Sequence, residues 1–215
     1  MVNLEIKILV VGPIFTNCYL VADKETNQVL ILDAGAEPEK ILSSLAPKPY
    51  TPVAILATHC HLDHIEAVTQ LKRELKIPFL IPKGEEEILY QTIEIPPKPN
   101  GFLKGGDETK IGKVKFKVIS TPGHTPGGIS LYCQKEKVLF SGDTLFAGSI
   151  GRTDLPGGSE KEIKKSLRKL LQLPGDTLVF PGHGEKTTIE KEKETNPFCR
   201  IPTPPASNHL RRINR

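Results

Sequence analysis

Three histidines and an aspartate fall within six residues of this chain, in the run His59-Cys-His61-Leu-Asp63-His64. His59 and His61 are two residues apart, so their side chains point the same way in an extended backbone. Asp63 and His64 come where the chain turns into a predicted helix. Imidazole and carboxylate groups are the natural ligands of zinc, iron and manganese. The run therefore predicts a metal centre at the end of a strand.

Short apolar or alternating runs between glycines and prolines predict the strands. They are Leu4–Val11, Asn17–Ala22, Val29–Asp33, Val53–Thr58, Val114–Ser120, Ile129–Cys133, Lys137–Ser141 and Thr177–Phe180. Residues 53–57 are apolar throughout, which is typical of a central strand, whereas residues 114–118 alternate with lysines and predict one wet face. Both kinds of strand in one chain indicate a layered, mixed sheet.

Helical spacing of apolar residues alternates with these strands. The predicted helices are Glu37–Leu45, Ile65–Leu75, Glu85–Tyr90, Glu160–Leu171 and Thr188–Thr195. Ser159 and Glu162 fit a capping box at the start of the fourth helix. Two proline-rich stretches, Ile95–Asn100 and Ile201–Ala206, are predicted as loops. The alternation favours an α/β architecture, and 215 residues suit one domain spanning residues 1–215.

Composition narrows the classes of function. The net charge of +4 does not indicate a nucleic-acid partner, and no apolar run approaches the roughly 18 residues of a membrane span. Residues 1–11 contain Glu5 and Lys7 and lack a small-residue cleavage site, so we expect a first strand and not a signal peptide. The four cysteines are scattered without a C-x-x-C pair and are expected to be reduced thiols. A cytoplasmic protein with no membrane partner is predicted.

Three further candidate ligands share one context, because each follows an apolar strand in a glycine-rich turn. They are His124 in Pro-Gly-His-Thr, Asp143 in Ser-Gly-Asp-Thr and His183 in Pro-Gly-His-Gly. Side chains from such strand ends converge on one edge of an α/β sheet. Seven ligands are a natural number for two metal ions.

The spacing suggests how these side chains would be divided between two ions. The first ion would be held by His59, His61 and His124, the second by Asp63, His64 and His183, with Asp143 bridging them. A lone histidine is more often an ordinary core or surface residue, Asp63 alone could be a helix N-cap and Asp143 a turn former. Clustering makes the metal centre the better interpretation. His209, in the basic tail, is given no role.

The ordered motifs H-x-H-x-D-H, Gly-His, Ser-Gly-Asp and Pro-Gly-His resemble the metallo-β-lactamase superfamily, over about residues 17–183. Asn17–Val21 and Ser141–Phe146, followed by Gly151-Arg152, are similar to the glyoxalase II branch, the hydroxyacylglutathione hydrolases. Short single-domain members of that branch share Gly151-Arg-Thr-Asp-Leu-Pro-Gly157 and Thr195-Asn-Pro-Phe198. The resemblance implies a four-layer αββα sandwich with the site at one edge of two sheets.

The activity implied is hydrolysis of a thioester such as S-lactoylglutathione with two divalent ions, zinc being favoured and iron or manganese being alternatives. A water held between two such ions has its pKa lowered toward ~7 and supplies a hydroxide nucleophile. Asp63 would orient this nucleophile, and the resemblance places a basic glutathione contact at Arg152. Full-length glyoxalase II has a C-terminal helical domain that this chain is too short to hold, so the thiol carrier is left open.

Three alternatives remain at this point. A mononuclear iron persulfide dioxygenase of the same fold would use His59, His124 and Asp143. A metal-dependent nuclease could use the basic tail Arg211–Arg215, but phosphate binding calls for a larger basic patch. A purely structural metal site would be closed and tetrahedral, unlike seven ligands in open loops. β-Lactamase activity is disfavoured, because the resemblance expects Cys in place of Asp143 and another ligand in place of His64.

Overall fold

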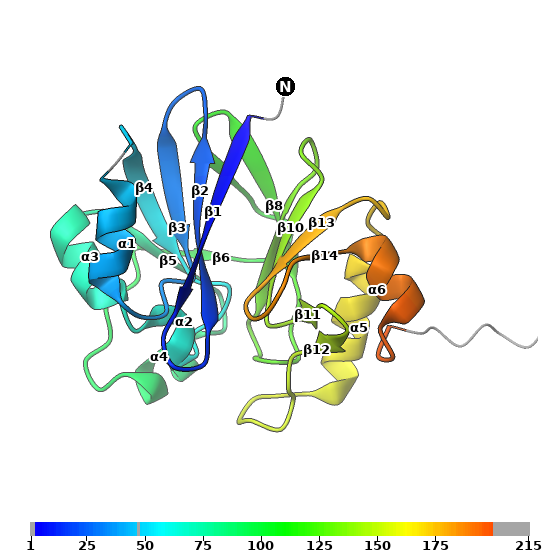
Figure 1. The fold of residues 1–215 in the computed structure, drawn as a ribbon. Coiled ribbons are helices and arrows are strands. Elements are labelled where there is room, and N and C mark those ends of the chain that lie inside the picture. Colours follow the sequence, from blue (N-terminus) through cyan, green and yellow to red (C-terminus); the bar gives the residue numbers. More distant parts are fainter. Residues whose placement is uncertain (1–2, 47, 200–215) are drawn as a thin grey trace, which may run out of the picture.

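Two sheets face each other in the computed structural model of the protein, which describes residues 3–46 and 48–199 (Figure 1). The first, here called the N-terminal sheet, has six strands in the order β1-β2-β3-β4-β5-β6 in the described residues. They are β1 (Leu4–Val11), β2 (Thr16–Asp23), β3 (Gln28–Leu32), β4 (Thr51–Leu56), β5 (Phe79–Pro82) and β6 (Gly101–Leu103). β4 runs parallel to both of its neighbours, which confirms the prediction of a central strand.

The second, here called the C-terminal sheet, has the order β14-β13-β10-β9-β8-β7 in the same described part of the chain. Its strands are β7 (Glu108–Ile111), β8 (Val114–Ser120), β9 (Ile129–Cys133), β10 (Val138–Gly142), β13 (Leu178–Pro181) and β14 (Thr187–Thr188). Between β10 and β13, a short hairpin pairs β11 (Leu145–Phe146) with β12 (Ser149–Ile150). β8 alternates buried and exposed residues as its sequence pattern predicts.

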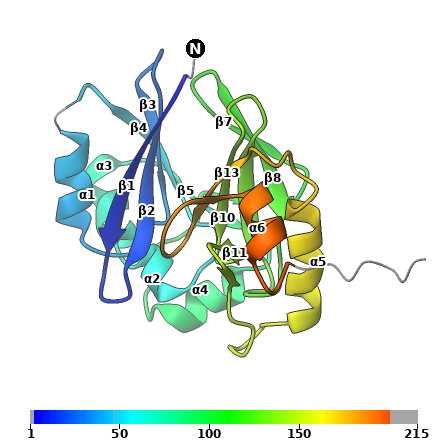
Figure 2. The same cartoon turned by 45° about the vertical axis from the view of Figure 1, so that its right-hand side comes forward.

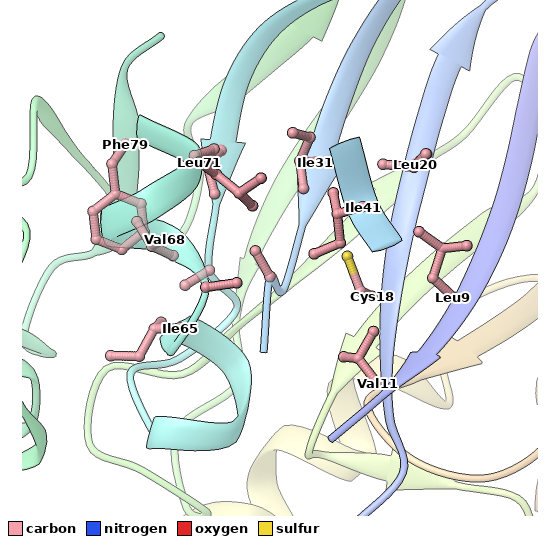
Figure 3. Close-up of a cluster of buried hydrophobic side chains, with 14 of the residues drawn as sticks. Leu9, Val11, Cys18, Leu20, Ile31, Ile41, Ile65, Val68, Leu71 and Phe79 are labelled. Carbon is pink, nitrogen blue, oxygen red and sulfur yellow. The ribbon is translucent and has the colours of Figure 1, made fainter. Parts of the chain in front are cut away.

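Helices cover the outer face of each sheet, which gives four layers (Figures 1 and 2). The N-terminal sheet carries α1 (Pro38–Leu45), α2 (Leu62–Ile65), α3 (Val68–Leu75) and α4 (Glu86–Thr92), and the C-terminal sheet carries α5 (Glu160–Leu170) and α6 (Ile189–Thr195). Figure 3 shows Ile41 of α1 and Leu71 of α3 packed against strand residues such as Ile31. The predicted αββα sandwich is therefore confirmed.

Aromatic residues fill the space between the two sheets. Tyr19 of β2 makes an edge contact with Phe140 of β10, with ring centroids 5.1 Å apart, and another with Phe180 of β13 at 5.8 Å. Phe116 of β8 lies in the same cluster. Leucine, valine and isoleucine side chains of both sheets complete this cluster, and each large aromatic ring buries a large apolar area. The sheets are thus fixed face to face, and the residues at their ends keep a fixed separation.

The structure departs from the sequence-based prediction in two ways. The strands β5, β6, β7, β11, β12 and β14 were not predicted, and the predicted helix Ile65–Leu75 is wrong in its bounds. The chain becomes helical at Leu62 and breaks before α3, because the Ala67 N–H donates to Ala34 O (3.1 Å). Asp63 consequently lies inside α2 and is not an N-cap.

Other local predictions are confirmed. The Ser159 side chain accepts a hydrogen bond from the Glu162 N–H at the start of α5, and residues 95–100 form a loop. All four cysteines are buried free thiols. In the described residues, no helix is long and apolar enough to cross a membrane. The second proline-rich stretch, His209 and the basic tail lie outside the described residues.

Candidate metal centre

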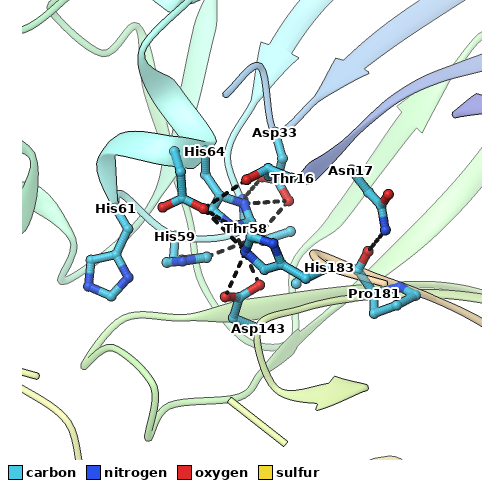
Figure 4. Close-up of polar contacts among 12 residues, drawn as sticks. Thr16, Asn17, Asp33, Thr58, His59, His61, His64, Asp143, Pro181 and His183 are labelled. Atoms are coloured by element: carbon cyan, nitrogen blue, oxygen red, sulfur yellow. Dashed lines mark hydrogen bonds and ion pairs between the residues drawn. The ribbon is translucent and has the colours of Figure 1, made fainter. Parts of the chain in front are cut away.

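The seven predicted ligand residues meet at one edge of the sandwich, between the ends of the two sheets (Figure 4). His59 and His61 follow β4, Asp63 and His64 lie in α2, and His124, Asp143 and His183 follow β8, β10 and β13. Residues more than a hundred positions apart are brought together because both sheets end at this edge. The convergence expected from strand-end turns is therefore found.

The side chains fall into groups whose potential ligand atoms lie within 4.8 Å of one another. One group is His59, His61 and His124; another is Asp63, His64 and His183; a third is His59, His64 and Asp143. The first two groups are the two sets that the spacing suggested. The third shares one histidine with each of them, so Asp143 lies between the two sets.

Asp143 is the carboxylate that reaches both sets. Its Oδ1 lies 3.4 Å from His64 Nε2, and its Oδ2 lies 3.4 Å from His183 Nε2 and 3.5 Å from His124 Nε2. A carboxylate that faces imidazoles on both sides can bridge two cations at the ~3.5–4 Å spacing of two-metal sites. The bridging role remains a prediction that this geometry permits.

Three imidazoles are oriented by contacts on the ring nitrogen that faces away from the cluster. The neighbouring oxygens are Thr58 Oγ1 for His59 (3.1 Å), Arg152 O for His124 (2.8 Å) and Ile14 O for His183 (3.2 Å). A carbonyl oxygen can only accept, so His124 and His183 donate from Nδ1–H. Their Nε2 atoms therefore face the cluster and offer a lone pair to a cation once any proton there is displaced, which is the usual arrangement of metal-ligating histidines.

Several buried polar atoms at the centre of the cluster make no hydrogen bond within the chain. They are His59 Nε2, His64 Nε2 and Asp143 Oδ1. Buried polar atoms without a partner are rare, because each costs about 1–3 kcal/mol. Lone pairs on nitrogen and oxygen that converge in this way fit divalent cations, and this donor set suits zinc, iron or manganese.

Carboxylates raise the pKa values of two histidines. Burial opposes a charge on His64, but Asp143 and Asp33 outweigh it and hold the pKa of His64 well above its usual value. His183 is also opposed by burial, and hydrogen bonds to Asp143 and Asp63 raise its pKa to about 9. Cations must displace these protons in order to bind, so metal affinity is expected to fall as the pH is lowered.

The pKa values of His59, His61 and Asp143 are shifted downward. Burial and the charge of His64 hold the pKa of His59 well below its usual value, and burial with His124 lowers that of His61 to about 4. Burial disfavours the charge on Asp143, yet His64 outweighs it and lowers the pKa of that carboxyl. His59 and His61 are thus held as neutral imidazoles and Asp143 as an ionised carboxylate, the forms that bind metals, whereas His64 and His183 must first lose a proton.

Asp33 is a residue that the sequence analysis did not assign to the site. Its Oδ1 accepts from the Thr58 N–H (2.7 Å), and its Oδ2 accepts from Thr58 Oγ1 (2.9 Å) and lies 3.2 Å from His64 Nδ1. Since the Thr58 hydroxyl donates to Asp33, it accepts from His59 Nδ1–H. Asp33 therefore orients two of the candidate ligands. Its only signal in the sequence is that it ends a predicted strand.

Glu85 is a second such residue. It is fully buried, and its two oxygens accept from the backbone N–H groups of Cys60 (2.9 Å) and Gly127 (2.7 Å). Cys60 lies between His59 and His61, and Gly127 follows the turn of His124. Glu85 thus holds together two loops that carry the first set of histidines. The sequence pattern indicated only a helix start here, which it also is.

Gly182 shows how closely the backbone approaches this centre. A Cβ atom at this position would lie 2.0 Å from Asp143 Oδ1 and 2.8 Å from the His64 ring. Any larger residue would displace these two side chains. The glycine before His183 is therefore required by the close approach of the chain.

A cavity of about 460 Å³ opens beside the cluster. Its walls are formed by Ile14, Phe146, Ser149, Ile150, Arg152 and Leu155 together with His61, Asp63, His124, Asp143 and His183. Small-molecule sites usually measure about 300–1,000 Å³. A somewhat larger groove, about 530 Å³, lies around Lys113 and Tyr132 and contains none of the histidines. The cavity beside the cluster is the better substrate site, because the reactive groups lie there.

Arg152 lies in the wall of this cavity, as the sequence analysis placed it near the site. Its guanidinium binds the Asp154 carboxylate through two contacts, Nε to Oδ1 at 2.8 Å and Nη2 to Oδ2 at 2.7 Å. Both side chains are largely exposed, at 61% and 67%. An ion pair exposed to solvent contributes little to the free energy of folding. A substrate carboxylate can therefore compete with Asp154 for Arg152.

The fold and the site together define a class: αββα sandwiches that hold a cluster of histidines and aspartates at the edge between two sheets. Residues 11–183 match the profile of the family described as "Metallo-beta-lactamase superfamily". The chain belongs to this superfamily. Metal-dependent hydrolysis is the class of activity that the family, the relatives and the cluster support.

Similar proteins include hydrolases and metal-bound structures. The hydroxyacylglutathione hydrolase GloC of Haemophilus influenzae is 35% identical, over 91% of this chain and 98% of its own length. The structure of BLEG-1 B3 metallo-beta-lactamase is 38% identical with a TM-score of 0.84, covering 92% and 100%. TTHA1623 in a di-iron-bound form is 38% identical with a TM-score of 0.82, covering 89% and 99%. ETHE1 from Myxococcus xanthus is 31% identical with a TM-score of 0.78, covering 90% and 83%.

Proposed function

We propose that this protein is a two-metal hydrolase that cleaves a small thioester such as S-lactoylglutathione. The observation that carries the proposal is the pair of ligand triads, His59, His61 and His124 beside Asp63, His64 and His183, with Asp143 between them. The similarity to a hydroxyacylglutathione hydrolase over nearly the whole chain supports the choice of substrate. TTHA1623, similar in fold, binds two irons, which supports the number of ions.

Bound divalent ions would lower the pKa of a shared water and polarise the thioester carbonyl. Asp63 receives a hydrogen bond from Thr16 Oγ1 (2.9 Å) and lies 3.2 Å from His183 Nε2, which fixes its carboxylate at the border of the cavity. From there it orients the attacking water. A thiolate, with a solution pKa near ~8.5, can leave without a strong general acid.

The proposal is tested by metal analysis combined with a panel of substrates. Chelated protein should be inactive, and restoring zinc, iron or manganese should restore cleavage of S-lactoylglutathione, followed as thiol release. The cluster should take up about two ions per chain. Cleavage by metal-free protein, or by a form holding a single ion at full rate, would contradict the two-metal mechanism.

A persulfide dioxygenase using His59, His124 and Asp143 is a second candidate, because Asp143 Oδ2 and His124 Nε2 face each other at 3.5 Å in this cluster. Oxygen uptake with glutathione persulfide separates the two activities. Oxygen uptake by the iron-loaded protein without thioester cleavage would contradict the hydrolase proposal and support the dioxygenase. Nitrocefin in the same panel tests β-lactam hydrolysis, which we expect to be absent.

Arg152→Ala is expected to raise KM for S-lactoylglutathione about tenfold, with little change in kcat, because a lost contact to a charged group costs about 1.5–3 kcal/mol in binding. Steady-state kinetics check this. Asp154→Asn is the matched control, since it releases the guanidinium and should leave KM unchanged or lower it. Equal KM values for Arg152→Ala and the unmodified protein would remove Arg152 from the substrate site.

A further inference from the structure

A second buried polar cluster lies outside the metal centre, where α6 meets the β11–β12 hairpin. Glu192 lies in α6 and Asn196 directly follows it. Both side chains are fully buried, at 0% exposure. Figures 1 and 2 both place α6 beside β11. Polar side chains such as these are rarely fully buried without hydrogen-bond partners, so the partners of these two residues indicate what they do.

Both side chains contact the backbone of the hairpin. Glu192 Oε2 accepts from the Gly148 N–H (2.8 Å), and Asn196 Nδ2 donates to Ser149 O (3.0 Å) and more weakly to Phe146 O (3.4 Å). The two side chains also bind each other, Nδ2 to Oε2 at 2.8 Å. Together they form what is here called the hairpin latch.

The remaining atoms of the latch are fixed as well. The Thr187 hydroxyl donates to Glu192 Oε1 (2.6 Å), and Asn196 Oδ1 accepts from the Phe198 N–H (3.0 Å). The motif Thr195-Asn-Pro-Phe198, which the metal centre does not use, is thereby accounted for: its asparagine faces the hairpin.

The base of the hairpin is anchored by the buried Leu145 and by Ile150, which packs beside it, but the tip, from Phe146 to Ser149, has no such support in the described part of the core. The hairpin has two residue pairs, Leu145 with Ile150 and Phe146 with Ser149, and isolated two-stranded hairpins are marginal in water. Phe146, Ser149 and Ile150 nevertheless form one wall of the cavity beside the cluster. The position of that wall therefore depends on the latch.

We propose that Glu192 and Asn196 are positioning residues, which fix the wall of the cavity that receives the thiol carrier of the substrate. The carrier is the part of the thioester beyond the reacting carbonyl, so the latch sets KM for long substrates and leaves the cleavage step unchanged. This assignment to the carrier rests on the proposed thioester hydrolysis. The role in holding the hairpin does not.

The test compares Glu192→Ala and Asn196→Ala with Glu194→Gln, an exposed position on the same helix. KM for S-lactoylglutathione should rise about tenfold in the two alanine variants, as expected when buried hydrogen bonds are lost. Values of kcat/KM for the truncated thioester S-lactoyl-N-acetylcysteamine, and bound metal, should stay within about twofold. Glu194→Gln should behave as the unmodified protein.

Glu192→Gln should have a KM close to that of the unmodified protein, unlike Glu192→Ala. Its amide oxygen can accept from Gly148 and Asn196 while its amide N–H₂ donates to the Thr187 hydroxyl, which can also accept. Thr187→Val removes one contact of the latch and serves as a milder variant if an alanine variant fails to fold.

Hydrogen exchange gives a readout that does not need activity. Residues 145–150 should exchange faster in Asn196→Ala, with the rest of the chain unchanged. Uniformly faster exchange, loss of metal, or unchanged exchange and KM would each overturn the proposal. If the unmodified protein cleaves neither thioester, the proposed function fails, while the exchange result still decides the role of the latch.

Discussion

Asp143→Ala protein is expected to lose its activity and its metal together, with kcat lower by at least about three orders of magnitude. Asp143 is the one carboxylate that faces His64, His124 and His183 at 3.4–3.5 Å. Without it, two cations would be held close together with little negative charge between them. Metal content by mass spectrometry and S-lactoylglutathione cleavage measure both losses.

Asp176→Ala is the matched control for this variant, because Asp176 is an exposed aspartate paired with Lys137 away from the cluster. It should keep full metal content and activity. Two ions per chain retained by Asp143→Ala protein would contradict a bridged pair, and full activity with one ion would point to a single-metal mechanism.

Asp33→Asn is expected to weaken most the ion held by Asp63, His64 and His183, and to weaken less the ion held by His59, because Asp33 orients His59 only through Thr58. The asparagine oxygen can still accept from the Thr58 N–H, but its amide N–H₂ then faces His64 Nδ1, where a carboxylate oxygen lies now. His64 Nδ1 would become the acceptor, and the ring proton would move to Nε2. A protonated Nε2 cannot bind a cation, so the set with Asp63 and His183 is disrupted.

Changes of this kind in the residues behind metal ligands usually cost 10–100-fold in affinity or activity. Titration of metal-free protein with zinc should show the site of His64 weakened by about that factor and the site of His59 weakened less. Asp23→Asn is the control: Asp23 is also buried and accepts the backbone N–H of Lys113, but lies far from the centre in the sheet. Equal weakening in both variants would show a general loss of stability and not a change of tautomer.

The sequence predicted the long strands and the converging turns because each carries its own signal. Residues 53–56 of β4 are all apolar, and β8 alternates. The strands β5, β6, β11, β12 and β14 have two to four residues, too few to show a period. Their pairing is decided by neighbours distant in the chain, which local patterns do not record.

The candidate site was also predictable only where the signal is local. The histidines were recognisable because four candidate ligands stand within six residues, whereas Asp33 and Glu85 stand alone, 25 residues before and after the atoms that they bind. Arg152 was placed at the site by its motif, but its pairing with Asp154 depends on the conformation of an exposed loop. An isolated residue that orients a ligand through distant contacts leaves no recognisable pattern in a single sequence.

The candidate ligands come from both halves of the sandwich: four are attached to β4 and α2, and three follow strands of the C-terminal sheet. Cations bound there would clasp the two halves at their open edge, where the aromatic core does not reach. Binding free energy then becomes folding free energy, about 4 kcal/mol when free metal exceeds its dissociation constant about a thousandfold. In a cell starved of metal, the protein would therefore be not only inactive but also more easily unfolded by heat and cleaved by proteases.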